Sequence, residues 1–153
     1  MAPDPTPTTT PPQPEIDASR VIPIVVGSSL RAEREDRPLA YQLADRLAGP
    51  AVAMGLEPVV CTDVWYLNDA TLAERAAVSL GGPDVNALTA HLASRVPSAY
   101  VIDGVLMVQF DVEARRGHAC CWGVNAEATA QAVIAFMDRH AEAFLAGHGV
   151  PLL

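Results

Sequence analysis

Several side chains of this sequence have the chemistry of a nucleophilic site. Ser28 or Ser29 could serve as the nucleophile, His118 as the base, and Asp63 as the group that orients the base. The sequence has no Gly-x-Ser-x-Gly turn, the element that exposes a nucleophilic serine above a strand in many hydrolases. The other three histidines fit the role of base equally well. The pattern therefore does not single out a catalytic set.

A second group has the atoms of a soft-metal site. His118, Cys120 and Cys121 lie close together in the chain, and Cys61 is distant from them. Alternate residues of a strand share a face, so residues 118 and 120 point one way and residue 121 the other. Because the three cannot converge on one ion without a bulge, we interpret the cysteines as small buried apolar residues and predict no metal site.

Two glycine-containing turns each join a strand-like segment to a helix-like one. The first contains Gly81 and Gly82, and the second contains Gly123 and Asn125. Glycine lets the backbone approach a ligand closely, and the start of a helix favours anions, so the pair could form a binding rim. Ordinary turn and capping chemistry explains both turns as well, and this alternative stays open.

The most informative stretch runs from residue 26 to residue 40, between the first strand and the first long helix. It resembles the phosphate loop of the NADPH-dependent FMN reductase family, whose fold is flavodoxin-like. The residues that match the pattern of that loop in register are Ser29, Leu30, Arg31, Arg37, Leu39 and Ala40. The resemblance implies FMN as a cofactor, with its phosphate held by Ser28, Ser29, Arg31 and Arg37.

The same stretch differs from the family pattern at three positions. Ser28 stands where the pattern has glycine, Arg34 where it has a hydroxyl residue, and Asp36 where it has asparagine. With Glu33 and Glu35, the loop carries three carboxylates, which repel a phosphate dianion unless its arginines balance them. The alternative is a solvated, salt-bridged loop before the first long helix.

Two aromatic residues, Trp65 and Tyr66, follow the second predicted strand among polar neighbours. They could stack on a flavin ring or a nucleoside, anchor a partner protein, or cover the edge of the sheet.

The alternation of apolar segments and turn residues predicts the elements that position these residues. Buried strands are expected at residues 21–26, 58–62, 77–80 and 119–122, and a hairpin turns at Asp103-Gly104. Helices are expected from Pro38, at 71–75, after Asp84, and from Ala126 to about residue 146. Pro23 suggests that the first strand begins late or lies at an edge. The fold class is α/β, a three-layer sandwich with a mainly parallel sheet and an antiparallel hairpin, flavodoxin-like or Rossmann-like.

Composition narrows the possible functions. The net charge of −8 argues against nucleic-acid binding, and all ten basic residues are arginine. Without lysine, Schiff-base chemistry and the phosphate-binding lysine of a P-loop are excluded. Three cysteines favour a reducing, cytoplasmic location, and the sequence predicts neither a signal peptide nor a membrane span.

Residues 1–19 are rich in proline and threonine and are expected to be a disordered tail before a single domain at residues 20–153. The tail could dock a partner or have no role. With no compelling catalytic set, the sequence favours a non-enzymatic accessory or interaction module, part of a larger assembly with a protein partner or a second copy. The alternative is an FMN-binding flavodoxin-like oxidoreductase or flavin carrier, and binding of a nucleotide or sugar phosphate without redox chemistry is a third.

Overall fold

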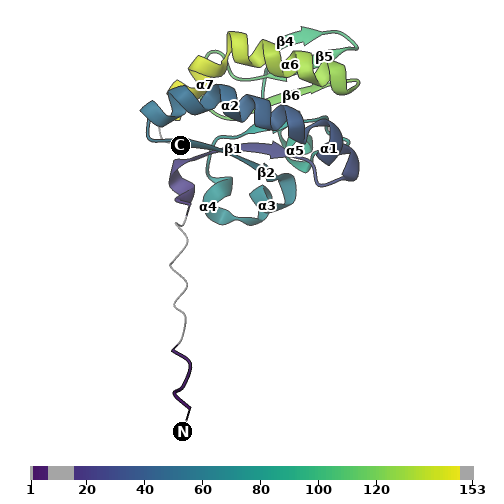
Figure 1. Cartoon of the computed structure of the whole chain (residues 1–153). Coiled ribbons are helices and arrows are strands. Elements are labelled where there is room, and N and C mark those ends of the chain that lie inside the picture. Colours follow the sequence, from purple (N-terminus) through teal and green to yellow (C-terminus); the bar gives the residue numbers. More distant parts are fainter. Residues whose placement is uncertain (1, 7–15, 149–153) are drawn as a thin grey trace.

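The computed structural model describes residues 2–6 and 16–148. Residues 16–148 form the predicted three-layer α/β sandwich, in which helices cover both faces of one sheet (Figure 1). The sheet has six strands in the order β2-β1-β3-β6-β5-β4. Four are parallel, and β5 runs antiparallel to both of its neighbours. The arrangement is compatible with a flavodoxin-like or Rossmann-like sandwich.

The elements follow the predicted segments closely. The strands are β1 Val21–Val26, β2 Glu57–Thr62, β3 Val78–Leu80, β4 Ser98–Ile102, β5 Leu106–Gln109 and β6 Ala119–Gly123. The helices are η1 Ala18–Arg20, α1 Leu30–Glu35, α2 Arg37–Ala53, α3 Asp63–Asn68, α4 Ala70–Ala73, α5 Ala87–Leu92, α6 Ala126–Arg139 and α7 Ala141–Gly147.

The suggestion from Pro23 that β1 begins late or lies at an edge is wrong. β1 is an inner strand that starts at Val21 and pairs with β2 along its whole length. The neighbour on its other side, β3, reaches β1 only at Ile24 and Val25. Beside Pro23 that flank of β1 has no paired strand, so the proline can be accommodated inside the sheet.

Three stretches differ from the expected helices. The charged loop after β1 is itself helical, because Ser29 caps α1 by accepting a hydrogen bond from the Ala32 N–H at 3.2 Å. The segment that carries Trp65 and Tyr66 is also a helix, α3, capped by Thr62. The expected last helix is divided at His140, which has a non-helical backbone and separates α6 from α7. Capping side chains mark the starts of the first two of these helices, and a search for apolar periodicity does not detect such caps.

Two apolar clusters lie on the two faces of the sheet. The larger one joins β1, β3, β5 and β6 to α2, α6 and α7, and it contains Phe110, Phe136 and Phe144. The smaller one lies under α3, α4 and α5 and contains Tyr66, Leu88 and Cys120. The helices after β1 and β6 therefore cover one face, and those after β2 and β3 cover the other.

The tail predicted at residues 1–19 lies mostly outside the described residues. Of this stretch, residues 2–6 have no secondary structure, and Asp17 caps the single turn of η1. The last five residues of the predicted domain, 149–153, are also outside the described part.

Candidate functional site

A pocket of about 400 Å³ opens at the carboxyl end of the sheet, between β3 and β6. The chain leaves β3 toward α5 on one face and leaves β6 toward α6 on the other. Where neighbouring parallel strands send their connections to opposite faces, a crevice forms at their carboxyl ends, and ligands of open α/β proteins bind in such crevices. The position of the pocket is thus a consequence of the topology.

Four parts of the chain line this pocket. They are the end of α1 with Asp36, the turn after β3, the hairpin tip between β4 and β5, and the turn from β6 into α6. The charged lining residues are Arg31, Glu35, Asp36, Asp84 and Asp103. Four carboxyl groups therefore share the pocket with one guanidinium, which makes it acidic.

Asp36 is the most unusual of these groups. It joins α1 to α2 and is only 5% exposed, yet its side chain caps neither helix by a hydrogen bond. Within residues 2–6 and 16–148, its carboxylate has no hydrogen-bond or ion-pair partner. Burial raises the pKa of Asp36 to about 6, Glu35 and Asp84 add to the rise, and Arg31 opposes it. A carboxyl group whose pKa is raised by burial beside a pocket is typical of binding or catalytic sites.

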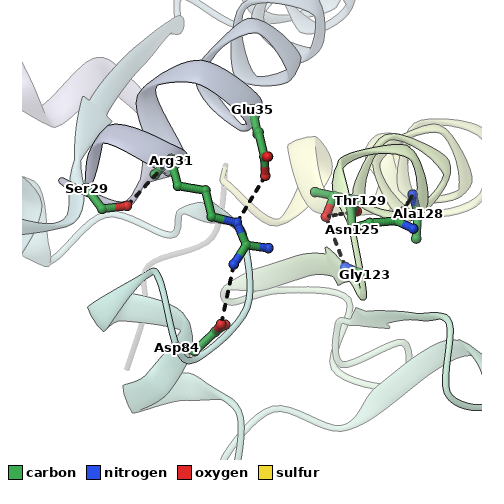
Figure 2. A network of polar contacts seen from close by, with 9 residues as sticks. Ser29, Arg31, Glu35, Asp84, Gly123, Asn125, Ala128 and Thr129 are labelled. Atoms are coloured by element: carbon green, nitrogen blue, oxygen red, sulfur yellow. Dashed lines mark hydrogen bonds and ion pairs between the residues drawn. The ribbon is translucent and has the colours of Figure 1, made fainter.

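Arg31 lies between two of the other carboxylates, as Figure 2 shows. Its Nε is 3.1 Å from an oxygen of Glu35, and one terminal nitrogen is 3.9 Å from an oxygen of Asp84. The guanidinium thus connects α1 to the turn after β3 across the pocket. Because both partners are largely exposed, these ion pairs contribute little stability.

Two successive glycines in the turn after β3 lie close to Asp36 and to Trp122. Gly81 has a φ of +97°, and a Cβ there would lie 2.6 Å from an Asp36 carboxylate oxygen. A Cβ on Gly82 would lie 3.5 Å from Cδ1 of Trp122. The missing side chains let a carboxylate and an indole ring approach the same two-residue turn from different elements.

The opposite wall is the turn into α6, which a local network of hydrogen bonds holds (Figure 2). Asn125 caps α6 by accepting from the Ala128 N–H at 2.8 Å. The Thr129 hydroxyl accepts from the Gly123 N–H at 3.1 Å and donates to the Asn125 carbonyl at 3.1 Å. This second glycine turn is thus a capped helix start, as the alternative interpretation of the sequence expects.

The four residues that the resemblance implies around the phosphate make separate contacts. Arg31 alone of them lines the pocket. The Ser29 hydroxyl caps α1, and the Ser28 hydroxyl donates to Asp63. Arg37 binds Glu33 through two hydrogen bonds of 2.7 and 3.0 Å, one helical turn away.

The two aromatic candidates occupy different environments on α3. Tyr66 is 2% exposed, and its hydroxyl donates to the carbonyls of Ala73 and Arg75 at 3.2 and 2.7 Å. The Tyr66 side chain is therefore part of the apolar core beneath α3 and α4. Trp65 is 60% exposed and belongs to the surface of the same helix.

The residues of the nucleophilic set lie at opposite ends of the sheet. Asp63 is near Ser28 at the carboxyl end and also accepts from the N–H groups of Val64 and Ala87 at 2.8 Å. His118 precedes β6 at the amino end, where its Nδ1 accepts from the Ala77 N–H at 3.1 Å. The carboxylate therefore ties the ends of β1, β2 and the turn before α5 together and does not orient the histidine.

The cysteines alternate as predicted for a strand. Cys120 belongs to the smaller apolar cluster and Cys121 to the larger one, and both are free and buried. Burial raises the pKa of the Cys61 thiol to about 11 and that of Cys120 to about 12, so neither is a nucleophile at neutral pH. In the described part of the chain, no three His, Cys, Asp or Glu side chains come close enough to hold a metal ion.

Replacing Asp36 by asparagine is expected to stabilise the protein at neutral pH. The pKa of this carboxyl is raised from 3.8 to about 6, so ionisation opposes folding, and the stability contributed by the protonated form is lost as the pH rises through that range. We expect Asp36→Asn to gain about 2 kcal/mol at pH 7.5 and to match the wild type near pH 4. Urea denaturation across this range measures the difference, with the exposed Asp45→Asn as the matched control. Parallel curves for wild type and Asp36→Asn would contradict the assigned burial cost.

Sequence reasoning missed Asp36 as a site residue and also missed the role of the hairpin tip. Asp36 appeared only as a departure from a phosphate-loop pattern, and that departure was the available signal. Its proximity to Gly81 depends on how α1 folds back over the sheet, which no local pattern specifies.

No helix in the described ranges is both long and apolar enough to cross a membrane. The chain matches no protein-family model, and no curated protein is significantly similar to it.

Proposed function

We propose that this chain is a non-enzymatic accessory module that binds a partner protein around the pocket between β3 and β6. The observation that carries the proposal is a set of apolar side chains left exposed around the mouth of that pocket. We call this set the hairpin patch, and its members are Val101, Ile102, Val105 and Val124.

The exposure of these residues is substantial. Val124 is 62% exposed, and the three hairpin residues are 37% to 40% exposed. Isolated apolar residues on a surface need no explanation, whereas several gathered beside a cavity are typical of a binding surface. The patch also has a firm base, because the Val124 N–H donates to the Val105 carbonyl at 2.9 Å and links the two turns that form it. A rigid patch loses little entropy on binding.

The alternative proposal is an FMN-binding oxidoreductase or flavin carrier. The strand order β2-β1-β3 supports it, because flavodoxin-like proteins share this order and bind FMN beside the first strand. The acidic pocket, the pairing of Arg37 with Glu33 and the buried ring of Tyr66 favour the accessory module instead. Binding of a nucleotide or sugar phosphate meets the same unfavourable charge.

Native purification with a visible spectrum and mass spectrometry separates the two proposals. We expect a colourless protein with a stoichiometric companion. A double variant, Val101→Gln with Val124→Gln, should retain at most about a tenth of that companion, because contacts at the centre of an interface carry most of the binding energy. The matched control is Val52→Gln with Val64→Gln, two exposed valines that are not among the pocket-lining residues. Flavin bands at unit stoichiometry, or equal retention by both double variants, would overturn the accessory-module proposal.

The accompanying proposals concern the tail, the oligomeric state and the location. Removing residues 1–19 in the same experiment shows whether the tail contributes to docking. Light scattering of the purified chain distinguishes a second copy from a different protein as the partner. A cytoplasmic location is proposed from the three free thiols, which a reducing compartment preserves.

A further inference from the structure

We propose that the pocket between β3 and β6 binds an organic cation, an ammonium or guanidinium group on an apolar stem, with the Asp36 carboxylate as its anionic partner and Trp122 among the residues that line the pocket. The inference rests on the proposed function and deepens it, since the cation would be a lysine or arginine side chain that the partner presents.

The negative charge of the pocket favours a positively charged ligand. Asp36, Glu35, Asp84 and Asp103 line it together with the single guanidinium of Arg31. Arg31 is already shared between Glu35 and Asp84, at 3.1 and 3.9 Å, and forms no ion pair with Asp36. An anion entering here would meet excess negative charge, whereas a cation would find it favourable.

Asp36 is the carboxyl group of the pocket best placed to receive a cation. It is 95% buried, because only 5% of its surface is exposed, and within the described part of the chain its carboxylate has no partner. It lines the pocket, so a group entering from solvent can reach it. An ammonium or guanidinium would supply the missing donors through charge-assisted hydrogen bonds.

The residues that line the pocket favour an organic cation over a metal ion. A divalent metal ion needs several converging oxygen ligands, and the described residues contain no group of three suitable side chains. An organic cation needs one carboxylate and an apolar or aromatic surface. Here Asp36 and Trp122 both line the pocket, close to the turn of Gly81 and Gly82. A cation near an indole ring gains attraction from the ring itself.

The apolar stem has a surface to lie on. Val101, Met107 and Val85 line the same pocket as Trp122 and Asp36. The volume of about 400 Å³ leaves room for a lysine or arginine side chain, or for a small arylalkylamine. Both sources present the same chemistry, and the experiment separates them.

Nuclear magnetic resonance titration of the full chain tests the proposal directly. The probes are phenethylammonium and N-acetylarginine amide, with phenethyl alcohol as the neutral match and phenylacetate as the anionic one. We expect saturable shifts of the Gly81 and Gly82 amides and of the Trp122 indole N–H with the cations only. The arginine amide should bind at least as tightly as the free amine, whereas clear preference for the amine would assign the pocket to a small molecule instead of a partner side chain.

The variant Asp36→Asn should weaken binding of the cationic probes about tenfold at pH 7.5. Asp45→Asn, an exposed aspartate on α2, is the matched control and should bind as the wild type does. Lowering the pH from 7.5 to 5 should weaken wild-type binding as Asp36 takes up a proton, with Arg31, Glu35 and Asp84 as the neighbouring charges. Unfolding curves recorded on the same samples establish that each variant is folded.

Two results would overturn the inference. One is equal binding of phenethyl alcohol and phenethylammonium, and the other is binding that Asp36→Asn leaves unchanged. Failure here is distinct from failure of the accessory module. If the Val101→Gln, Val124→Gln variant loses the companion and Asp36→Asn retains it, the accessory-module proposal stands and the cation-site proposal is rejected. Probe binding without any companion would reject the module and retain the cation site.

Discussion

Replacing Asn86 by aspartate is expected to cost the protein about 4 kcal/mol of folding free energy or more. Asn86 is 1% exposed and makes four hydrogen bonds with the backbone. Its amide nitrogen donates to the carbonyls of Val25 and Leu80 at 3.1 and 2.8 Å. Its amide oxygen accepts from the N–H groups of Leu88 and Thr89 at 2.9 and 3.3 Å. An aspartate has the same shape but would turn a carboxylate oxygen toward two buried carbonyls.

Urea denaturation at pH 7.5 measures this loss, with Asn86→Ala as a second variant that adds no charge and should lose about 3 kcal/mol. The matched control is Asn68→Asp. The amide of Asn68 donates to the Val64 carbonyl at 2.7 Å in an exposed position, so the same substitution should cost less than about 1 kcal/mol there. Similar losses at residues 86 and 68 would contradict the role assigned to Asn86. The position matters because Asn86 joins the ends of β1 and β3 to the start of α5, and thereby supports one wall of the pocket.

The second large effect is expected at Gly27, the first residue after β1. A Cβ at this position would lie 1.9 Å from the Val85 carbonyl oxygen and 3.2 Å from Cβ of Ala32. The nearest obstacle is backbone, which cannot rotate away as a side chain could. We expect Gly27→Ala to destabilise the protein by about 3 kcal/mol, at the upper end of the cost of overpacking. Thermal unfolding measures the loss.

Gly49→Ala is the control for the Gly27 substitution. A Cβ on Gly49 would meet no atom within 4 Å beyond its chain neighbours, so this variant should change stability by less than about 1 kcal/mol. If Gly27→Ala proves equally mild, the turn after β3 can move away from β1. The rim of the pocket would then be more mobile than its hydrogen bonds imply.

Both positions lie where the end of β1 meets the turn after β3. The Val85 carbonyl lies close to Gly27 at the carboxyl end of β1, the strand beside which flavodoxin-like proteins bind their cofactor. The pocket lies instead between β3 and β6, the next pair of neighbouring strands whose connections leave toward opposite faces of the sheet. This difference is a second reason, besides charge, to favour a partner over a flavin.

Local patterns predicted the strands and the outline of the helices. An unbroken apolar run identified β1 as a buried strand, and Asp103-Gly104 identified the β4–β5 hairpin, because side-chain alternation and turn chemistry act over a few residues. The same reasoning missed α1, which is mostly charged, and α3, which is too short to show a helical period, and only Ser29 and Thr62 signalled their starts.

The candidate site could not be predicted in the same way. Most of the residues singled out between Ser28 and Arg37 make contacts within α1 or with its neighbours. The reason is that side chains four residues apart lie next to each other on a helix. Asp36, Gly81 and Trp122 carry no shared motif and come from three different segments. Their approach depends on which face of the sheet each connection takes.

By itself, therefore, the sequence determined the α/β class, the positions of most strands and turns, and the burial of the three cysteines, because each follows from interactions among near neighbours in the chain. Only the tertiary structure decided that Asp36, two glycines and Trp122 would line one pocket. That arrangement results from β3 and β6 lying side by side while their helices depart to opposite faces, a property of the whole sheet and of no single segment.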